Sequence, residues 1–478
     1  MTLTPQQDVY APTIVIGAGP YGLATAALLR RSGTPTVILE RSERVGASWA
    51  HRYEHLRLHT TPGTSKLPGL PLPRQAGPWV SRDDYVRYLE SYAAHHRLDV
   101  RLTTPVLRIE RAEPGSGPMW LVHTPDGPVP TDAVVVATGR CHSPYVPHWP
   151  GRATFTGTLL HSAHYRSPAP YRGRHVLVVG AGNSGTEIAD VLAGAGAEPV
   201  RIAIRTPPNI LPRSSSRWHA VGRLTEALPL PWRDHTSLLT QRIAVPDLTS
   251  RGLPRPRTGL YTRNVLEGVN PVLDHGFVDA VRSGRVEPVA AVQGFDGPDV
   301  VLADGTRLRP DTVIAATEYR TDLHDLVGSL GVLDEDGLPR AGGPQPHPEA
   351  PRLYFAGYTN PLTGVLRQAG IEARAIARAL RRETAHVGLQ PRSPRSERTP
   401  RQRSGATADR WFRNLRTSNE QHLRLPVGRR TVFSGTAFAA ELHAPVEAWP
   451  GPDRRITLAS RQGDRTTNFS SHNSRCPD

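Results

Sequence analysis

The residues with the clearest chemical meaning lie in two glycine-rich segments, each of which follows a run of β-branched residues. Residues 14–22 read Ile-Val-Ile-Gly-Ala-Gly-Pro-Tyr-Gly, and residues 178–185 read Val-Val-Gly-Ala-Gly-Asn-Ser-Gly. In this spacing the first glycine permits a tight turn, the second lets the backbone approach a pyrophosphate, and the third lets a helix pack on a strand. The N–H groups that begin the helix then face the phosphates. Two such segments predict two nucleotide cofactors in one chain, an arrangement suited to passing a hydride from nicotinamide to flavin.

We expect the first segment to bind its cofactor through Gly17, Gly19, Gly22 and Glu40. Glu40 ends the next predicted strand, residues 36–40, close to the spacing at which a carboxylate meets a ribose hydroxyl. A glycine-rich turn without a ligand is the alternative. The joint occurrence of strand, glycines, helix and acid argues against it.

We expect the second segment to bind its cofactor through Gly180, Gly182, Asn183, Ser184 and Gly185. The corresponding strand, residues 200–205, ends in Arg205 where the first domain has an acid. A planar guanidinium with several donors matches a 2′-phosphate, so Arg205 predicts NADPH rather than NADH. An arginine that is only solvated at the strand end is the alternative.

The elements that must position these residues follow from the apolar pattern. Strands are expected at residues 13–16, 36–40, 133–139, 312–318 and 353–358, and helices at 21–31 and from about 368 to 382. This alternation predicts an α/β fold with two Rossmann-like dinucleotide-binding domains. The strand at 353–358 returns to the first domain after the second glycine segment, so we expect the second domain to be inserted into the first.

Two segments fit neither domain. Residues 206–270 are proline-rich and have few periodic apolar positions, so we expect an irregular subdomain with short helices covering the site. Residues 384–478 are rich in Arg, Pro, Ser and Thr, and such a composition buries too little apolar surface to offset ordering entropy, so disorder is expected. More than half of the net charge of +15 lies in this tail, which argues against a nucleic-acid function.

The composition bounds the remaining possibilities. A chain of 478 residues is long enough for two or three domains. It has no apolar run of about 18 residues and no signal-peptide pattern at its start, so we expect a cytoplasmic protein. Cys141 and Cys476 are the only cysteines, which excludes a disulfide framework and a Cys-x-x-Cys redox pair. No metal-ligand cluster and no paired-carboxylate or nucleophile–base site stands out.

A third motif indicates a family. Residues 155–165, Phe-Thr-Gly-Thr-Leu-Leu-His-Ser-Ala-His-Tyr, match Phe-x-Gly-x-x-x-His-x-x-x-(Tyr/Phe), and the chain thereby resembles the flavin-containing monooxygenases. The motif also stands just before the second glycine segment, as in that family. Further segments resemble the soluble YUCCA-type branch of these class B flavoprotein monooxygenases. Plant members of this branch oxidatively decarboxylate indole-3-pyruvate. The similar segments are residues 46–49, 53–59, 88–93, 182–188 and 271–276. The likeness covers roughly residues 10–382.

The resemblance implies which cofactor each domain binds. It implies FAD in the first domain and NADPH in the second, with a small organic substrate and dioxygen as the other reactants. The expected boundaries are 1–148 for the first part of the FAD-binding domain, 149–318 for the NADPH-binding domain with the subdomain at about 206–270, and 319–383 for the return of the FAD-binding domain. Trp49 and His59 are expected near the flavin, and His161 and Tyr165 beside the NADPH site.

The resemblance also implies a mechanism. NADPH reduces FAD, the reduced flavin and dioxygen form a C4a-(hydro)peroxyflavin, and bound NADP⁺ shields this adduct from water. One oxygen atom passes to the substrate and the other leaves as water. The flavin carries the chemistry and the protein orients it. The substrate is left open among a nucleophilic amine, a sulfide and a 2-oxo acid.

At two positions, His59 and Glu318, the residue type bears on the mechanism. His59 stands where animal-type members carry an asparagine near the flavin, as in the YUCCA-type branch, and it is our candidate catalytic residue; a packed loop histidine is the alternative. Glu318 stands where the family has the glycine of an Ala-Thr-Gly turn. We expect its carboxylate either to be solvated or to repel the cofactor phosphates.

Two other functions are left open at this stage. One is a flavoprotein oxidase or reductase that consumes NADPH and releases hydrogen peroxide without oxygenating a substrate. The other is a nonenzymatic remnant of the scaffold that acts through its arginine-rich tail. Substrate-independent peroxide formation would indicate the first, and failure to bind FAD would indicate the second.

Overall fold

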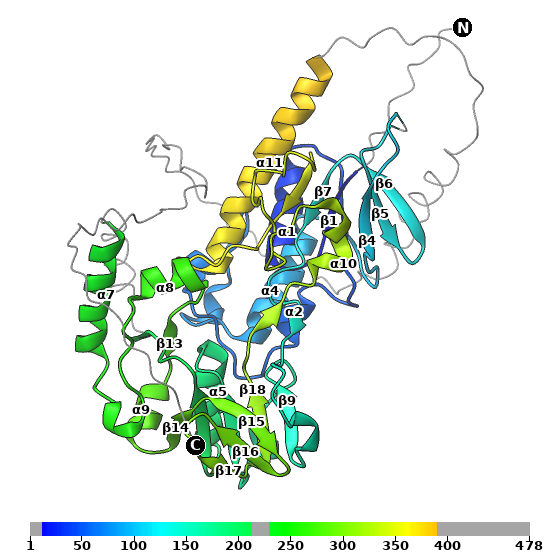
Figure 1. Ribbon diagram of the computed structural model, residues 1–478. Coiled ribbons are helices and arrows are strands. Elements are labelled where there is room, and N and C mark those ends of the chain that lie inside the picture. The colour runs from blue at the N-terminus through cyan, green and yellow to red at the C-terminus, as the bar shows by residue number, and fades with distance from the viewer. Residues whose placement is uncertain (1–11, 116, 213–228, 390–478) are drawn as a thin grey trace, which may run out of the picture. The chain divides into compact units, whose positions relative to one another are not determined.

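The first sheet contains the strand that precedes the first glycine segment. The computed structural model describes residues 12–115, 117–212 and 229–389, which all belong to one unit of the chain, residues 1–422. The strand order is β20-β7-β1-β2-β3, and every neighbouring pair is parallel (Figure 1). The strands are β1 (Thr13–Ile16), β2 (Thr36–Leu39), β3 (Asp99–Arg101), β7 (Val134–Val136) and β20 (Leu353–Phe355). Their β-branched residues are buried, as parallel strands covered on both faces require.

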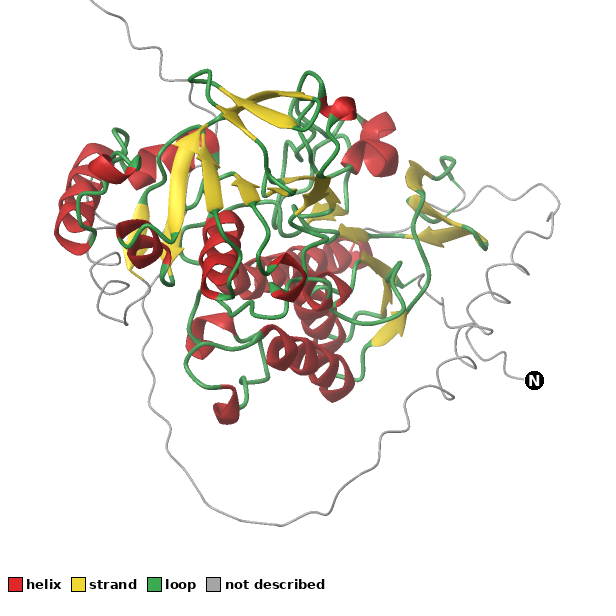
Figure 2. Ribbon diagram, turned by 90° about the horizontal axis from the view of Figure 1, so that it is seen from below, coloured by secondary structure: helices red, strands yellow, loops and turns green. Residues whose placement is uncertain are grey.

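Three helices pack beside this sheet: α1 (Pro20–Arg31), α4 (Arg82–His95) and α11 (Val365–Leu389). Helix α1 packs against α11 and α4, and in the view of Figure 2 the helices (red) lie side by side. Buried alanines such as Ala24 and Ala373 belong to the shared core and let the backbones approach closely. The core formed here holds the beginning of α1, and hence the first glycine segment, at the end of β1.

The second sheet contains the strand that precedes the second glycine segment. Its order is β14-β11-β10-β18-β9, again with parallel neighbours. The strands are β9 (Thr158–His161), β10 (Val176–Val179), β11 (Val200–Ile204), β14 (Val286–Ala290) and β18 (Thr312–Ala315), and helices α5 (Asn183–Gly194) and α9 (Phe277–Arg282) pack beside them. All five strands lie in the chain between β7 and β20. The strands that precede the two glycine segments, β1 and β10, therefore each lie at the centre of a parallel sheet. Each is followed, after the glycine turn, by a helix.

Residues 206–270 contain more regular structure than the sequence predicts. Helices α7 (Leu230–Ala244) and α8 (Leu260–Glu267) are present, and β12 (Ile210–Pro212) pairs in parallel with β13 (Val272–Asp274). The prediction of short helices alone is wrong for α7, which has 15 residues. Its buried face is polar, being made by Asp234, Ser237 and Gln241 at helical spacing, so a search for apolar periodicity misses it. Residues 213–228 lie outside the described part.

Smaller elements complete the described chain. Two three-stranded antiparallel sheets consist of β4 (Arg108–Arg111), β5 (Trp120–Thr124) and β6 (Gly127–Thr131), and of β15 (Val292–Asp296), β16 (Asp299–Leu302) and β17 (Arg307–Leu308). A short pair joins β8 (Ser143–Pro144) to β19 (Tyr319–Arg320). The remaining α-helices are α2 (Ala47–Ala50), α3 (Pro62–Ser65) and α10 (Leu323–Val327).

The end of the described chain differs from its expected boundary. Helix α11 begins at Val365 and continues to Leu389, past residue 383, where the tail was expected to start. Residues 390–478, on which the prediction of disorder mainly falls, lie outside the described residues. No helix among the described residues is both long enough and apolar enough to cross a membrane.

Candidate cofactor-binding and active site

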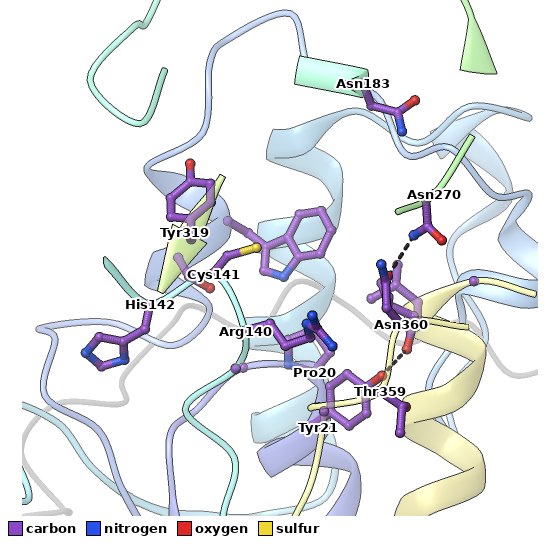
Figure 3. A pocket seen from close by; sticks show the side chains of 18 of the residues that line it. Pro20, Tyr21, Arg140, Cys141, His142, Asn183, Asn270, Tyr319, Thr359 and Asn360 are labelled. Atoms are coloured by element: carbon purple, nitrogen blue, oxygen red, sulfur yellow. Dashed lines mark hydrogen bonds between the residues drawn. The ribbon is translucent and has the colours of Figure 1, made fainter. Parts of the chain in front are cut away.

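Both glycine segments open into the same cavity. It has a volume of about 1480 Å³, and Gly17 and Gly19 line it together with residues 182–185 of the second segment. A site for one small ligand typically has about 300–1,000 Å³, so this cavity can hold more than one. Figure 3 shows part of the wall, with Pro20 and Tyr21 of α1 labelled below and Asn183 of α5 above. The fold therefore brings the two expected nucleotide sites to one space.

The first glycine segment has the geometry that the sequence predicts for a pyrophosphate turn. Gly19 precedes α1, lines the cavity, and would have no atom within 4 Å of an added Cβ. A Cβ on Gly22 would lie 1.9 Å from the carbonyl oxygen of Gly17. Gly17 itself has φ +105°, a conformation that favours glycine. The open backbone at Gly19 and the close packing at Gly22 fit the expected FAD.

The second glycine segment repeats this geometry. A Cβ on Gly185 would lie 1.9 Å from the carbonyl oxygen of Gly180, and Gly182 precedes α5 and lines the cavity. Ser184 also lines the cavity. Asn183 uses its amide within the protein: Nδ2 donates to the carbonyl of Pro271 at 3.0 Å, and Oδ1 accepts from the N–H of Leu273 at 2.9 Å. The residue therefore ties the segment before β13 to the start of α5.

Glu40 lies directly after β2 and lines the cavity, where a ribose was expected. Both of its carboxylate oxygens also accept backbone hydrogen bonds. Oε2 accepts from Ala18 at 2.7 Å, and Oε1 accepts from Ser42 at 2.9 Å. These bonds hold the carboxylate beside the first glycine segment and leave each oxygen a further lone pair. The ribose contact stays a prediction.

Arg205 is the first residue after β11, and it is exposed. It is not among the residues that line the cavity. The assignment to the 2′-phosphate stays a prediction.

His161 and Tyr165 are buried side chains of the motif at residues 155–165, called the linker motif below, and they lie beside the cavity. His161 ends β9, and its Nδ1 accepts from the N–H of Ala163 at 3.0 Å. The other nitrogen, Nε2, therefore carries the proton and donates to the carbonyl of Glu318 at 3.0 Å. Burial lowers the pKa of His161, which keeps this imidazole neutral near pH 7. Tyr165 is fully buried in the core of the second sheet. Neither side chain lines the cavity, so both support the site through packing.

Glu318 extends into the cavity from the turn after β18. Its backbone has φ +69°, and its Oε1 would lie 3.5 Å from a Cβ on Gly182. The side chain is exposed because the cavity is open to it, while protein atoms surround the carboxyl group closely. This burial raises the pKa of Glu318, and the nearby guanidinium groups of Arg140 and Arg52 oppose the rise. The carboxylate therefore lies beside the glycine where the NADPH pyrophosphate is expected.

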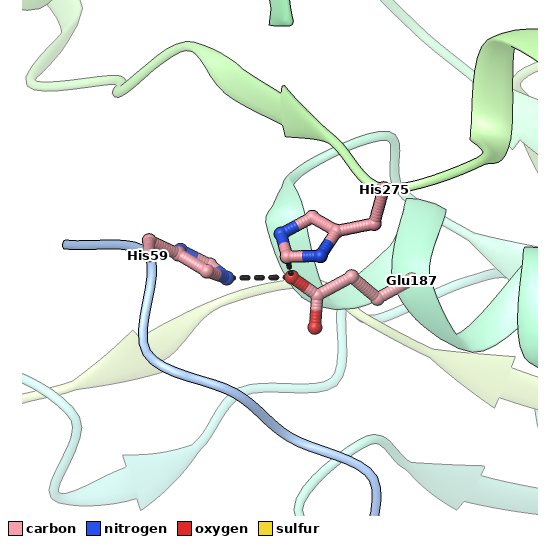
Figure 4. Close-up of side chains that lie close together, drawn as sticks. All are labelled: His59, Glu187 and His275. Carbon is pink, nitrogen blue, oxygen red and sulfur yellow. Dashed lines mark hydrogen bonds and ion pairs between the residues drawn. The ribbon is translucent and has the colours of Figure 1, made fainter. Parts of the chain in front are cut away.

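The two residues expected near the flavin both line the cavity. The Trp49 ring contacts the ring of Tyr85 edge-on, with centroids 4.8 Å apart. His59 lies in the loop before α3, and its Nε2 is 2.5 Å from Oε1 of Glu187 on α5. Nε2 of His275 lies 3.3 Å from the same oxygen (Figure 4). His59 is therefore paired with a buried acid. Neither interpretation from the sequence, a catalytic residue or a packed loop histidine, included this partner.

The structure brings together groups that sequence reasoning did not select. Atoms of His59, Glu187 and His275 lie within 4.8 Å of one another, although no metal-ligand cluster was evident in the sequence. The three residues are far apart in the chain and match no ligand spacing, so only the fold could reveal the group. Further residues that line the cavity and were not selected are Arg52, Arg140, Arg233, Asn270 and Asn360.

In the cavity wall, hydrogen bonds connect the segment after α8 to the loop after β20. Nδ2 of Asn270 donates to Oδ1 of Asn360 at 2.7 Å, as Figure 3 shows, and Nδ2 of Asn360 donates to the carbonyl of Gly268 at 2.6 Å. Asn360 follows β20 of the first sheet, whereas Gly268 follows α8. The segment between β12 and β13 is therefore fastened to the loop that borders the first nucleotide site.

Comparison with known proteins gives consistent matches. The model of the pyridine nucleotide-disulphide oxidoreductase family matches residues 14–217. The indole-3-pyruvate monooxygenase YUCCA1 of Oryza sativa subsp. japonica is 34% identical over 361 residues, covering 74% of this chain and 88% of that protein. The probable indole-3-pyruvate monooxygenase YUCCA4 of Arabidopsis thaliana is 33% identical over 363 residues, covering 74% and 87%.

Solved structures agree with the fold. A flavin-containing monooxygenase from Stenotrophomonas maltophilia is 26% identical and aligns with a TM-score of 0.60 over 79% of this chain and 98% of its own. A structure of OTEMO in complex with FAD and NADP is 18% identical and aligns with a TM-score of 0.61 over 79% of this chain and 85% of its own. The latter shows similarity of fold alone.

Proposed function

The chain belongs to the YUCCA-type flavin monooxygenases, and on that premise we propose that it oxygenates a small 2-oxo acid. It is an NADPH-dependent monooxygenase that uses FAD and NADPH as cofactors and dioxygen as the oxidant. For a 2-oxo acid the overall reaction converts substrate, dioxygen, NADPH and one proton into the shortened carboxylic acid, carbon dioxide, water and NADP⁺.

The shared cavity is the observation that carries this proposal. Hydride transfer requires the nicotinamide and the flavin to meet, and both glycine segments face one space of about 1480 Å³. We propose two Rossmann-like domains, with the NADPH-binding domain inserted into the FAD-binding domain between β7 and β20. Bound FAD supplies the redox and dioxygen chemistry. The protein orients both cofactors and keeps water away from the reacting atoms.

The proposed division of cofactors follows the two glycine segments. FAD is bound at the first segment, with Glu40 toward its ribose and Trp49 and His59 near the isoalloxazine. NADPH is bound at the second segment, with Arg205 toward the 2′-phosphate. A cytoplasmic location and the 319–383 return of the FAD-binding domain stay predictions.

Arginine side chains in the cavity wall support an anionic substrate, and they stand among acidic lining residues such as Glu267 and Glu318. Arg52, Arg140 and Arg233 line the cavity. The guanidinium of Arg233 lies over the Tyr261 ring, 4.2 Å from its centroid, so stacking holds it in place. An arginine can bind a carboxylate through two parallel hydrogen bonds. The relatives named above act on indole-3-pyruvate, which is an aromatic 2-oxo acid.

The proposal is tested by following the oxygen atoms. The FAD-loaded protein is mixed with NADPH, ¹⁸O₂ and one of four substrates: indole-3-pyruvate, phenylpyruvate, a tertiary amine or a thioether. The incorporation of ¹⁸O into the products is measured by mass spectrometry. We expect one ¹⁸O atom in an arylacetic acid and substrate-dependent consumption of NADPH. Labelled amine or sulfide oxide without labelled acid would reject the 2-oxo acid. Substrate-independent NADPH consumption with stoichiometric hydrogen peroxide would favour the oxidase alternative.

A further inference from the structure

The contact between His59 and Glu187 determines which nitrogen of the imidazole carries a proton. Burial alone raises the pKa of the Glu187 carboxyl, but hydrogen bonds from His59 and Tyr53 and the charges of His59 and His275 outweigh this and lower it. The carboxyl group is therefore ionised near neutral pH and can only accept hydrogen bonds. Because Nε2 of His59 lies 2.5 Å from Oε1, Nε2 must be the protonated nitrogen.

The second nitrogen of His59 is left for another partner. Nδ1 has no hydrogen-bond partner within residues 12–389 as far as the structure describes them. The side chain lines the cavity and is 31% exposed there. Neutral His59 therefore offers a lone pair at Nδ1, and protonated His59 offers a proton at the same atom.

The Glu187 carboxylate is held in place by burial and by a second hydrogen bond. Its side chain is 6% exposed, and Oε2 accepts a hydrogen bond from the Tyr53 hydroxyl at 2.6 Å. It projects from α5, whose start is fixed to the segment before β13 by Asn183. A buried carboxylate in this position interacts with the imidazole more strongly than a solvated one does, because the local dielectric is low.

Other titratable groups also face this carboxylate. Nε2 of His275 lies 3.3 Å from Oε1 and approaches from the loop after β13 (Figure 4). His55 lies on the same loop as Tyr53; burial lowers its pKa, and the charge of Glu187 opposes this. The imidazoles of His59, His275 and His55 and the phenol of Tyr53 are thus arranged around one negative charge.

The distances favour a proton over a metal ion between these groups. Nε2 of His59 and Oε1 of Glu187 are 2.5 Å apart. An ion bound to both at roughly 2.1 Å would have a ligand–metal–ligand angle of about 70°, whereas tetrahedral zinc prefers about 109°. A hydrogen bond accounts for the separation without any movement of the buried carboxylate.

We propose that Glu187 is a positioning residue that fixes the orientation and tautomer of His59, and that His59 supplies through Nδ1 the proton consumed in each oxygenation. The proton leaves Nδ1 of the imidazolium, enters the water that the reaction releases, and is replaced from solvent, while Glu187 stays ionised throughout. The catalytic part of this inference rests on the proposed function, whereas the positioning part concerns the protein alone.

The test combines a spectroscopic and a kinetic measurement on the FAD-loaded protein. Protein labelled with ¹⁵N-histidine is titrated by NMR, and His59→Gln identifies the His59 signals. We expect the proton of neutral His59 on Nε2 in the unmodified protein and a mixture of tautomers in Glu187→Gln. Glu110→Gln is the matched control, since it removes the 2.7 Å partner of His123 on the β4–β5–β6 sheet and leaves His59 unaltered.

The kinetic arm separates turnover from binding. In Glu187→Gln we expect kcat to fall about tenfold or more with KM for NADPH nearly unchanged, because general acid–base groups contribute roughly 10²–10⁴-fold. The dependence of the rate on pH should also change, because the carboxylate charge beside the proposed proton donor is removed. Tyr53→Phe should change this pH dependence by less, because Glu187 keeps its charge and loses only one hydrogen bond, and this variant serves if Glu187→Gln does not fold.

The outcomes distinguish this inference from the proposed function. An unaltered tautomer in Glu187→Gln, or stoichiometric zinc bound to the unmodified protein, would overturn the positioning role. The expected tautomers with an unaltered pH–rate profile would overturn the proton-donor role. Absence of oxygenation by the unmodified protein would reject the proposed function, and the catalytic role with it, while the tautomer measurement would still decide the positioning role.

Discussion

The Nε2–H group of His161 donates to the backbone carbonyl of Glu318 at 3.0 Å, which joins the linker motif to the turn after β18. Glu318 has φ +69°, a conformation that a residue with a side chain adopts at a cost. The bond therefore stabilises a turn built for glycine while the side chain extends toward Gly182. This hydrogen bond therefore joins His161 of the family motif to Glu318, the residue that replaces the glycine usual in the family.

Replacing Glu318 with glycine should strengthen NADP⁺ binding. The carboxylate lies beside Gly182, where it opposes a pyrophosphate, and we expect the dissociation constant to fall about tenfold in Glu318→Gly, which corresponds to about 1.4 kcal/mol. Glu318→Gln separates the two effects, because it removes the charge but keeps the strained side chain. Isothermal titration calorimetry measures the change. Weaker binding in both variants would mean that the carboxylate assists the nucleotide.

Replacing Gly185 with alanine should disrupt the second nucleotide site. Its Cβ would lie 1.9 Å from the carbonyl of Gly180, so α5 must move away from β10. We expect a loss of stability of about 3 kcal/mol or more and loss of NADPH binding with FAD retained. Gly194→Ala in the same helix is the control: nothing lies within 4 Å of its added Cβ, and a small gain in stability is expected. Thermal unfolding measures the change in stability, and titration with NADPH measures the loss of binding. Near-native stability of Gly185→Ala would contradict the packing argument.

Replacing Arg205 with alanine should mainly raise the KM for NADPH. A guanidinium paired with the 2′-phosphate contributes about 1.5–3 kcal/mol, or roughly ten- to hundredfold in affinity. The KM for NADH should change little. Arg201→Ala, within β11 just before Arg205, is the control, since Arg201 pairs with Glu287 at 2.8 Å. Equal use of NADPH and NADH by the unmodified protein would refute the assignment of Arg205.

The burial of His161 should make stability depend on pH. Its pKa is lowered in the folded state, so below about pH 6.5 the unfolded chain binds a proton that the folded one does not. The free energy of unfolding should therefore fall as the pH is lowered from 7 to 5. In His161→Gln this contribution should disappear, whereas His164→Gln, at an exposed position of the same motif, should keep it. Urea unfolding at several pH values tests the difference; identical slopes in the two variants would contradict it.

The sequence alone determined the features that depend on local geometry. A strand, a Gly-x-Gly-x-x-Gly turn and a helix impose their steric requirements within one short stretch, so β1, β10 and the packing at Gly22 and Gly185 could be predicted. The return of β20 beside β7 followed from the order of the elements. Helix α7 could not be predicted from apolar periodicity, because its buried positions are polar and are satisfied by neighbouring segments: Asp234 accepts from the N–H groups of Tyr261 and Thr262.

Only the tertiary structure decided which distant side chains meet. His59, Glu187 and His275 come from three separate elements, and nothing in the type or spacing of these residues specifies that two imidazoles face one carboxylate oxygen. The same holds for the carboxylate of Glu318, which reaches Gly182 because β18 and β10 are neighbours in the sheet. Local sequence specifies the shape of each nucleotide-binding turn. The electrostatic surroundings depend on contacts between residues far apart in the chain, and these exist only once the sheets have packed.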